Sequence, residues 1–414
     1  MLYGVKIRLY PNETQENQLW QMFGNSRFVW NQMLNLINER YENNPSAPFL
    51  HKYDLDLLLK SLKEEYPFLK KSDSTSFQIV DQNMDQAWKM YFEDDTHQWG
   101  KPRFCSRKYT KQSYSGKNTK SGKYSTVRVV GRRYMKLPKL GIVKTGKVKF
   151  LEGLQIKRYT VVHDSDNRYY LALQIDGNIE QLAKTGRMVG IDVGLENVVN
   201  TSDGQKIAPF KADKLEKEIR LWQRKYDRRK NKAKRLTEEA KNRGDLTYKP
   251  FENYTNVEKA RERKARLQKK KANKRKDYLD KITTDLVKRY DVIVIEDLKV
   301  KNMLKNHKLA RAIQEQSWYM FRRMLEYKCA WYGKKLIVVD PKYTTQMCSN
   351  CGHIKKGEDH LTLSGNKKHG TTHDEYICYE CGYVGDRDIN AAINILHLGI
   401  KKLLEEQEEQ AKNN

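Results

Sequence analysis

The chain has 414 residues, of which 80 are Lys or Arg and 52 are Asp or Glu, so its formal net charge at pH 7 is +28. This length exceeds that of one average domain, and the charge argues against an ordinary metabolic enzyme. Hydrophobic residues make up 38% and aromatic residues 10% of the sequence, enough for packed cores and too many for wholesale disorder. We expect a globular, multi-domain protein with a polyanionic partner.

The positive charge is concentrated in two segments. Residues 101–149 contain 16 Lys or Arg and no Asp or Glu, and residues 206–289 contain 30 Lys or Arg against 13 Asp or Glu. Localised charge of this size is typical of phosphate binding, because a basic surface that nothing neutralises repels itself. A solvated basic face without a specific partner is the alternative.

The sequence contains no stretch that approaches the ~18 consecutive apolar residues of a membrane span, and its start lacks the apolar region of a signal peptide. We therefore expect a cytoplasmic protein with no membrane partner. Four of the six cysteines form two CxxC pairs, while Cys105 and Cys329 stand apart. This distribution indicates a metal site rather than a disulfide framework.

The sequence begins with a strand that is followed by helices. Residues 3–10 alternate as a strand does, and Asn12 with Gln15 forms a capping-box pattern that starts a helix. Two more helices are predicted at 53–65 and 74–94. A helical block therefore interrupts a module that begins with a strand.

Short strands and turns fill residues 97–182, with clear strands at VKFLEGL, YTVVHD and RYYLALQI. We expect a small β-barrel whose first strand is the amino-terminal one. The barrel would comprise residues 1–11 and 97–183, and the inserted helical domain residues 12–96.

Residues 211–289 indicate a basic helical hairpin, with helices at about 211–243 and 255–289. Apolar residues recur at helical spacing along the first helix, which leaves a narrow apolar seam and a basic remainder. An arm that lies along a nucleic-acid duplex is the favoured interpretation. A self-contained antiparallel coiled coil is the alternative.

Strands and helices alternate after Gly186. Apolar strands are predicted at 188–194, 292–298 and 335–340, and a helix at 309–332 lies between the last two. Buried apolar strands that alternate with helices indicate an α/β sheet.

Residues 343–414 differ in composition along their length and are predicted to form an insert, a helix and a tail. Residues 343–385 form a cysteine-rich insert, and a helix that begins near Asp388 closes the α/β domain, which would comprise 184–342 and 386–414. Residues 403–414 have the composition of a solvated tail.

Three acidic residues stand where such a sheet would bring them together. Asp192 lies within an apolar strand, Glu296 at the end of another, and Asp388 at the start of a helix. An acid within an apolar strand is costly unless it is paired or coordinates a cation. Taken in this order the acids match the RNase H arrangement, in which carboxylates hold two Mg²⁺ or Mn²⁺ ions for phosphodiester hydrolysis. Taken singly, each could cap a turn or helix or form an ion pair, and we assign the cap role to Asp386.

The four paired cysteines have the spacing of a tetrahedral Zn²⁺ site: Cys348, Cys351, Cys378 and Cys381. Four thiolates close the site, so the zinc would be structural. Gly352 and Gly382 follow the two pairs and allow tight turns. Nearby histidines are alternative ligands: His353, His360, His369 and His373.

These motifs, in chain order, resemble the TnpB family, the insertion-sequence-encoded RNA-guided endonucleases related to compact type V CRISPR effectors. The resemblance covers nearly the whole chain and rests on VKIRLYPNETQENQL, RFVWNQ, GIDVGL, VIVIEDLKVKNM, QSWYMFRRMLEYKCAWYG, YTTQMCSNCG and CYECGYVGDRDINAAINIL. It implies a multi-domain α+β protein. A β-barrel wedge domain would carry the helical recognition domain, and a RuvC-like (RNase H-like) α/β nuclease domain would carry a zinc ribbon or knuckle that binds the target nucleic acid.

The resemblance also implies a function. The protein would be a metal-dependent endodeoxyribonuclease that cleaves double-stranded DNA next to a short flanking motif, associated with transposon maintenance. A monomer would bind one guide RNA with a structured scaffold, and the guide would pair with one DNA strand. Asp192, Glu296 and Asp388 would be its catalytic residues. The alternatives are a compact type V CRISPR effector, an RNA-binding regulator that rarely cuts, and a guide-independent RuvC-like transposase or resolvase.

Candidate nucleic-acid contacts come from two sources. The segment SFQIVDQNMDQAWKMYF is similar to the family helix that approaches the target-flanking duplex, and KQSY resembles a wedge loop, which makes Gln78, Ser113 and Tyr114 candidates. The two basic segments add Lys101, Arg103, Arg107, Lys108, Lys111, Arg224, Arg228 and Arg229. Cys105 stands where the family commonly has Lys, which removes one expected phosphate contact.

Overall fold

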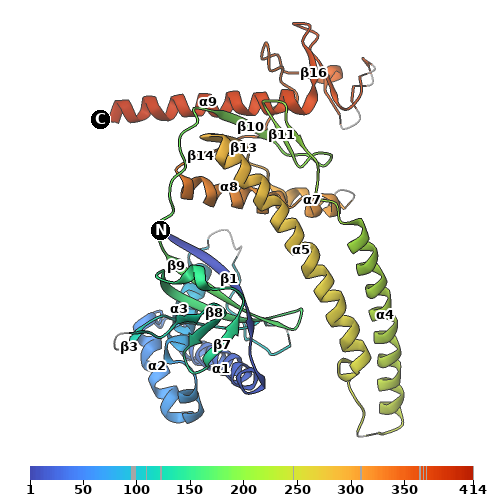
Figure 1. The fold of residues 1–414 in the computed structure, drawn as a ribbon. Coiled ribbons are helices and arrows are strands. Elements are labelled where there is room, and N and C mark those ends of the chain that lie inside the picture. The colour runs from blue at the N-terminus through green and yellow to red at the C-terminus, as the bar shows by residue number, and fades with distance from the viewer. Residues whose placement is uncertain are drawn as a thin grey trace. The chain divides into compact units, whose positions relative to one another are not determined.

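The computed structural model (Figure 1) forms two compact units, Met1–Asn178 and Ile179–Asn414. It describes residues 1–94, 99–108, 110–121, 124–245, 247–307, 310–362, 365–366, 368–369 and 371–413. Of the ranges predicted above, parts of the helical domain (95–96), the barrel (97–98, 109 and 122–123), the hairpin (246), the helix at 309–332 (309), the insert (363–364, 367 and 370) and the tail (414) lie outside this described part. Within it, no helix combines the length and apolar character needed to cross a membrane.

The helices of the first unit begin where the sequence predicts them. The capping box of helix α1 (Glu13–Asn43) is present, because Asn12 Oδ1 accepts the Gln15 N–H at 2.8 Å and Gln15 Oε1 accepts the Asn12 N–H at 3.1 Å. Helices α2 (Lys52–Glu65) and α3 (Ser74–Phe92) follow, with a short 3₁₀ turn between them. The three helices share a hydrophobic core of their own.

The strands of the first unit form one seven-stranded antiparallel sheet in the order β2-β8-β9-β1-β7-β6-β5. Their bounds are β1 Leu2–Tyr10, β2 Gln112–Lys117, β5 Arg128–Gly131, β6 Tyr134–Leu137, β7 Gly141–Thr145, β8 Gln155–Asp164 and β9 Arg168–Asp176. Strands β3 (Lys120–Ser121) and β4 (Tyr124–Ser125), of two residues each, pair only with each other in a separate hairpin. Strand β1 lies between β9 and β7, so the helices are inserted after an inner strand of the sheet.

Asn118 joins the two edges of this sheet. It follows β2, and its side chain donates to Val127 O at 3.2 Å and accepts from Val127 N at 2.8 Å, just before β5 begins. Because these edges meet, the sheet must curl around its core. No backbone ladder joins β2 to β5 among the described strands. A backbone bond from Thr126 N to Thr119 O, at 2.8 Å, adds to this link, so the structure gives a curled sheet where we expected a small barrel. The strand expected at VKFLEGL is wrong, because Lys149–Leu151 form a 3₁₀ turn.

Asp81 of α3 is fully buried, and in the described part of the chain no hydrogen-bond donor meets either of its carboxylate oxygens. Burial, and then the neighbouring Asp56, raise the pKa of Asp81 to about 8. In an unfolded chain the pKa of Asp is about 3.9. Between these values the unfolded state releases a proton that the folded state keeps, so stability falls as the pH rises through this window.

We therefore expect Asp81→Asn to stabilise the protein by about 2 kcal/mol more at pH 8 than at pH 5, because each pH unit within the window costs up to about 1.4 kcal/mol before local relaxation. Urea unfolding at both pH values measures this difference. Glu64→Gln changes an exposed acid on α2 and is the control. Equal effects of Asp81→Asn at the two pH values would contradict the prediction.

The second unit contains a five-stranded sheet in the order β12-β11-β10-β13-β14. Its strands are β10 Met188–Asp192, β11 Val199–Thr201, β12 Lys206–Ile207, β13 Val292–Glu296 and β14 Lys335–Val339. Strands β10, β13 and β14 are parallel, and β11 and β12 form an antiparallel extension. The predicted apolar strands and the mixed α/β sheet are confirmed.

Helices cover both faces of this sheet (Figure 1). Ile293 and Ile295 of β13 pack with α5 (Thr255–Arg289) and α8 (Trp318–Tyr332), while Val294 faces the other way, into a core that includes Ile395 of α9 (Arg387–Asn413). The alternation of a buried strand thus assigns successive side chains to two cores.

Helix α9 comes unusually close to the sheet at two glycines. A Cβ on Gly190 of β10 would lie 2.1 Å from the Ala392 carbonyl oxygen, and one on Gly399 would lie 2.4 Å from a methyl group of Val294. No side chain fits at either point, so glycine is required for this packing. Ala392 allows the same close approach from the helix side.

The basic hairpin is confirmed as two long helices, α4 (Asp213–Asn242) and α5, which are joined through a 3₁₀ turn at Phe251–Asn253. The buried seam between them is narrow, with Ala233 on α4 and Val257, Ala260 and Leu267 on α5. The ion pairs Arg263–Glu218 at 2.8 Å and Lys271–Glu216 at 2.6 Å link the two helices beside the seam.

Two expectations about helices are wrong. The helix expected at 309–332 is broken into α7 (Ala310–Gln316) and α8, because Ser317 adopts a left-handed conformation with φ 58°. A short helix, α6 (Val300–Met303), precedes them. The expected tail from residue 403 continues α9 as far as Asn413, since Leu403 packs against the core and Glu406 pairs with Lys335 at 2.7 Å.

Candidate metal centres

Asp192, Glu296 and Asp388 lie at one edge of the five-stranded sheet. Asp192 is the last residue of β10 and Glu296 the last residue of β13. These strands are parallel neighbours, so both carboxylates leave the sheet at the same edge. Asp388 belongs to the first turn of α9, which the contact at Gly190 holds against β10. The structure thus brings together the three acids selected from the sequence.

The surroundings disfavour negative charge on all three carboxylates. Burial, and then the charges of Glu296 and Asp388, raise the pKa of Asp192 to about 8. Burial also raises the pKa of Glu296, and burial together with Asp386 raises that of Asp388. Among the described residues, no Lys or Arg forms an ion pair with any of them, since the nearby Lys206 pairs with Asp386 instead. Half-buried acids without an ion pair suit a hard divalent cation, which prefers carboxylate oxygens.

The three carboxylates do not surround one point. In the described part of the chain their oxygens do not all lie within 4.8 Å of one another, in contrast to the sulfur cluster below.

Two neutral side chains hold these carboxylates. Thr344 Oγ1 donates to Glu296 Oε1 at 2.5 Å, and Asn200 Nδ2 donates to Asp388 Oδ2 at 3.0 Å. Asn200 is fully buried in β11, and its Oδ1 has no hydrogen-bond partner. Both donors fix an acid without cancelling its charge. Neither Thr344 nor Asn200 was predicted from the sequence. The one signal for Asn200 is its position as a polar residue directly after two valines.

Asp386 has the cap role that the sequence predicts for it. Its Oδ1 accepts the backbone N–H groups of Asp388 and Ile389, each at 3.0 Å, at the first turn of α9. Lys206 Nζ lies 2.5 Å from Asp386 Oδ2. Asp386 thus starts the helix, and the carboxylate of Asp388 is left for the group of three acids.

The four paired cysteines form a compact cluster of sulfur atoms. Cys348 Sγ lies 3.7 Å from Cys381 Sγ, and Cys351 Sγ lies 3.6 Å from Cys378 Sγ. All four sulfurs lie within 4.8 Å of one another. A tetrahedron of Zn–S bonds of about 2.3 Å has S···S edges of about 3.8 Å. The cluster therefore has the dimensions of a zinc site and is too open for disulfides.

Both CxxC pairs have the same turn. Gly352 N–H donates to Cys348 O and Gly382 N–H to Cys378 O, at 2.9 and 3.0 Å, and both glycines have positive φ, 76° and 70°. The role predicted for these glycines is confirmed. A side-chain hydrogen bond from Asn350 and the Tyr383 N–H lower the pKa of Cys381 to about 6, which favours a thiolate at neutral pH.

No histidine joins the four sulfurs within the described residues. His353 lies 3.9 Å from Glu380, and His369 lies 2.7 Å from Asp359. His373 instead meets Glu196 and Asp374, each at 3.1 Å, in a second, solvent-exposed group. His360, the fourth alternative, directly follows the 3₁₀ turn at Gly357–Asp359. The structure thus favours four thiolates over the histidine alternatives.

The cysteine cluster is tied directly to the three acids. Strands β15 (Glu375–Ile377) and β16 (Val384–Asp386) form a hairpin around the second CxxC, and α9 begins at the next residue. From α9, the fully buried Asn394 donates to the carbonyls of Thr344 and Met347 at 2.9 and 2.6 Å. Asn390 binds Met347 O and the N–H of Ser349. One helix thus carries Asp388 and anchors the loop that presents Thr344 to Glu296.

We expect Cys348→Ser to remove the bound zinc and to destabilise the insert 343–385, because a buried hydroxyl replaces a thiolate ligand. We expect binding of the target nucleic acid, which the resemblance assigns to this insert, to weaken before RNA binding does. Elemental analysis of the purified protein measures the zinc stoichiometry, with Cys105→Ser, outside the cluster, as the control. Unchanged zinc content in Cys348→Ser would refute the ligand assignment.

The nucleic-acid candidates of the first unit differ in exposure. Gln78 is exposed on α3 and Ser113 is half-buried on β2. Tyr114 is only 3% exposed and packs against Tyr159 in the core of the sheet. The prediction that Tyr114 contacts nucleic acid is therefore wrong, because the alternation of β2 turns this ring inward while Ser113 faces outward.

The basic stretch before β2 is held to α1 by its backbone. Asn31 accepts from Cys105 N at 2.8 Å and donates to Cys105 O at 2.9 Å, so its side chain clamps the residue that stands in place of the family's Lys. The surrounding basic side chains are exposed: Lys101, Arg103, Arg107, Lys108 and Lys111. The arrangement fixes the main chain and presents the charges to solvent.

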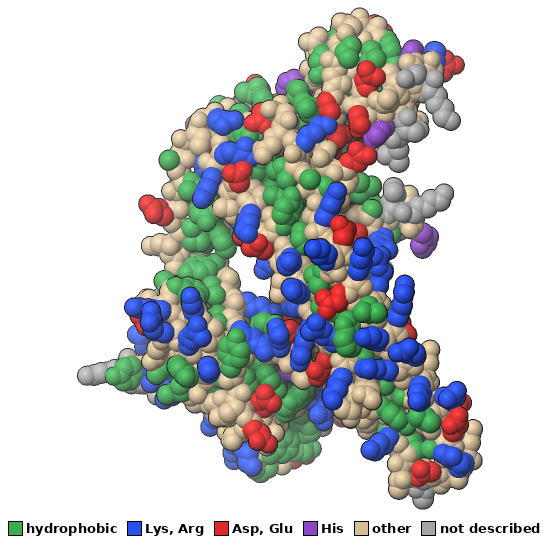
Figure 2. Space-filling view, turned by 45° about the vertical axis from the view of Figure 1, so that its right-hand side comes forward, with side chains coloured by type: hydrophobic (Ala, Val, Ile, Leu, Met, Phe, Trp, Pro, Cys, Tyr) green, Lys and Arg blue, Asp and Glu red, His purple; other side chains and the backbone are tan. Residues whose placement is uncertain are grey.

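Lys and Arg side chains gather over the hairpin of α4 and α5 (Figure 2). Arg224 and Arg228 are exposed, whereas Arg229 donates to Asn256 O of α5 at 2.9 Å and so also has a structural contact. Lys225 lies 4.7 Å from the ring centre of Trp222. Such cation–π contacts hold charge against the apolar seam.

Comparisons with known proteins agree with this organisation. Three family models match the chain, described as a helix-turn-helix domain at residues 1–45, a probable transposase at 162–307 and a Cas12f1-like TNB domain at 318–395. A Cas12f1 complex with sgRNA and target DNA aligns over 95% of this chain and 98% of its own, at 12% identity and a TM-score of 0.47. That structural match is too weak to support a conclusion.

Similar proteins cover nearly the whole chain. A protein of Streptomyces pristinaespiralis is 31% identical over 404 residues, which is 95% of this chain and 89% of its own length. InsQ of Escherichia coli (strain K12) is 30% identical over 96% of this chain and 92% of its own length. The names of both place them among the RNA-guided DNA endonucleases, and a TnpB-like protein of Acanthamoeba polyphaga mimivirus is 26% identical over 96% of this chain. The chain therefore belongs to the TnpB family.

Proposed function

We propose that this protein is an RNA-guided DNA endonuclease that hydrolyses phosphodiester bonds with two divalent cations at Asp192, Glu296 and Asp388. The observation that carries the proposal is the group of three half-buried carboxylates, with raised pKa values and no ion pairs among the described residues. The sheet order β12-β11-β10-β13-β14, with the acids on strand, strand and helix, supports an RNase H-like (RuvC) nuclease domain.

Two Mg²⁺ or Mn²⁺ ions, when bound, would activate a water and stabilise the leaving oxygen. The chain's own residues position their ligands. Thr344 holds Glu296, Asn200 holds Asp388, and the glycine contact of α9 fixes the distance between helix and sheet. Asp192, whose pKa burial raises to about 8, would hold a cation as the deprotonated carboxylate.

The partners that we propose are a guide RNA and double-stranded DNA beside a short flanking motif. The names of the relatives and the two basic segments support this assignment. Within the proposal, residues 1–11 and 97–183 are the wedge domain, and residues 12–96 the recognition domain. Residues 343–385 are the zinc-binding insert that contacts the target. The match to a transposase model supports an association with transposons.

A cleavage experiment tests the proposal. The protein is purified after expression with its native flanking DNA, and the RNA that accompanies it is sequenced. We expect a discrete RNA with a constant scaffold and a variable end, and Mg²⁺-dependent cleavage of a plasmid that matches this end. EDTA and a plasmid without the match are the controls.

Other outcomes favour the alternatives. Recovery of random cellular RNA at high salt, with cleavage of branched DNA, favours a guide-independent transposase or resolvase. A discrete RNA without cleavage in either Mg²⁺ or Mn²⁺ favours an RNA-binding regulator. The Cas12f1-like match at 318–395 makes a compact type V CRISPR effector the second candidate, which repeat-derived sequence in the RNA would identify.

A further inference from the structure

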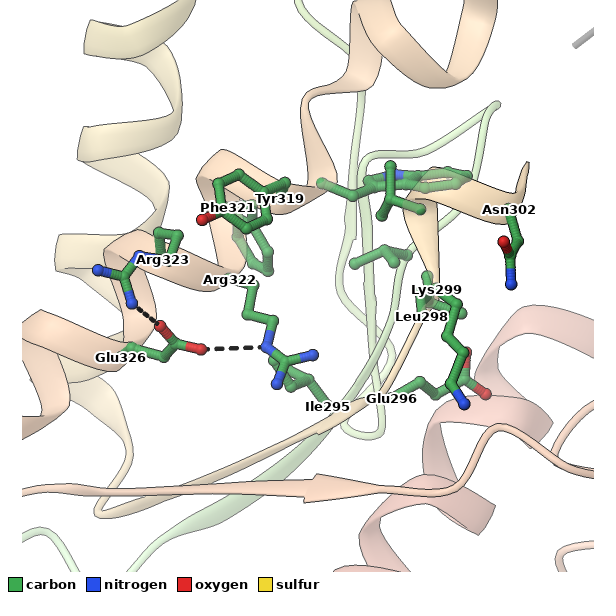
Figure 3. Close-up of a pocket in the computed structure, with 13 residues that line it drawn as sticks. Ile295, Glu296, Leu298, Lys299, Asn302, Tyr319, Phe321, Arg322, Arg323 and Glu326 are labelled. Carbon is green, nitrogen blue, oxygen red and sulfur yellow. Dashed lines mark hydrogen bonds and ion pairs between the residues drawn. The ribbon is translucent and has the colours of Figure 1, made fainter. Parts of the chain in front are cut away.

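A cavity of about 550 Å³ opens beside Glu296 (Figure 3). Its walls come from the ends of β10 and β13, from α6 and from α8, all within the second unit. The apolar wall residues include Val193, Ile295, Leu298, Val300, Trp318 and Phe321. A cavity of this size and character lies in the range of sites that bind small organic groups.

The wall of this cavity contains a hydrogen-bond donor without a partner. Trp318 is only 6% exposed, and its Nε1 has no acceptor among the described residues. A buried donor left unpaired costs about 1–3 kcal/mol. The strained φ of Ser317 directly precedes Trp318 and sets where α8 begins. A ligand that offers a hydrogen-bond acceptor to the indole N–H would remove this cost.

The polar residues of the cavity carry mainly positive charge. Arg322 and Arg323 both pair with Glu326, at 3.1 and 2.7 Å, as the dashed lines in Figure 3 show. Lys299 is exposed and forms no ion pair with any described residue. The apolar interior suits a flat, apolar group, and Lys299 at the opening, unpaired among the described residues, suits a phosphate attached to that group.

We propose, on the basis of the function above, that this cavity receives a nucleobase of the DNA strand next to the phosphate that is cut. Glu296 belongs both to the cavity wall and to the group of three acids, so a strand whose phosphate lies at the acids has its neighbouring base within reach. The base places its faces against the apolar walls and an edge acceptor on Trp318 Nε1. Lys299 meets the adjoining phosphate.

The cavity would accept bases without strict selection, because stacking is available to every base and each carries a ring or exocyclic acceptor. Base stacking is worth about 1–3 kcal/mol, which is about a fivefold to 150-fold effect on affinity. The site would therefore position the DNA strand for cleavage, and base pairing with the guide RNA would determine which sequence is cut.

The test is a thermodynamic cycle that requires no cleavage. The full chain, loaded with its co-purified RNA, binds a fluorescent single-stranded DNA in Ca²⁺, and an abasic nucleotide is moved along the strand one position at a time. We expect one position at which the abasic site weakens binding about tenfold in the wild-type protein. This penalty should shrink to about threefold in Trp318→Phe, which keeps an aromatic ring but removes the N–H.

Val300→Trp fills the cavity and should abolish the penalty. Trp331→Phe makes the same chemical change elsewhere on α8 and should retain it. Thermal unfolding of each variant shows that it is folded. A penalty that is equal in the wild type, Trp318→Phe and Val300→Trp would overturn the proposal.

The cycle separates this inference from the proposed function. Mg²⁺-dependent cleavage with no position-specific abasic penalty would leave the nuclease standing and refute the base site. Specific DNA binding with a Trp318-dependent penalty but no cleavage would support the base site and refute the nuclease. Failure of the RNA-loaded protein to bind DNA would overturn both.

Discussion

Asp192→Ala is expected to reduce DNA cleavage at least about a thousandfold, because about 4 kcal/mol of transition-state stabilisation depends on the cations that the three acids hold together. RNA binding should change by less than about twofold, since one buried acid adds little to a strongly basic interface. Cleavage of a matched plasmid and RNA binding by filter retention, both at fixed salt, measure the two effects.

Glu196→Gln is the matched control, because Glu196 is an exposed acid that follows β10 and lies outside the group of three. It should retain cleavage. Loss of RNA binding in Asp192→Ala would contradict the role assigned to Asp192. Comparable loss of cleavage in Glu196→Gln would move the catalytic centre toward the exposed group with His373 and Asp374.

Gly190→Ala is expected to destabilise the second unit by about 3 kcal/mol, the upper range for overpacking, because its methyl group would meet a backbone carbonyl at 2.1 Å. Backbone cannot rotate away as a flexible side chain can, so α9 must shift. The melting temperature of this unit should fall by about 6–12 °C. Cleavage should fall as well, since Asp388 moves with the helix.

Gly4→Ala supplies the control, because Gly4 also lies within a strand and a Cβ there would meet nothing within 4 Å. Calorimetry of both variants makes the comparison. If Gly190→Ala melts with the wild type, the close approach of α9 to β10 is not a requirement of the fold.

The order of helices and strands could be predicted from local patterns. The capping residues of α1, the apolar runs of β10, β13 and β14 and the seam of the basic hairpin all depend on neighbours in the sequence. The break at Ser317 could not be predicted, because the periodic pattern continues through it and the left-handed φ arises from tertiary packing. The continuation of α9 beyond residue 403 likewise depends on Leu403 and Glu406 meeting the sheet.

In the candidate site, too, some residues could be predicted from local sequence patterns and others only from tertiary contacts. Acids on apolar strands and paired cysteines are conspicuous in a sequence because burial makes them costly or their spacing is specific. Thr344, Asn200 and Trp318 are ordinary residues whose roles follow from hydrogen bonds made, or left unmade, across the fold. Tyr114 shows the opposite error, since an aromatic residue within a basic segment turned out to be part of a core.

The three acids are distributed over most of the second unit, with Asp192 near its start and Asp388 on the helix that follows the cysteine insert. During synthesis the ribosome releases Asp192 and Glu296 long before Asp388. A nascent or prematurely terminated chain that ends before α9 therefore carries an incomplete set of carboxylates. Under the proposed function, such a chain lacks one of the three metal ligands until the cysteine insert and its following helix have been made.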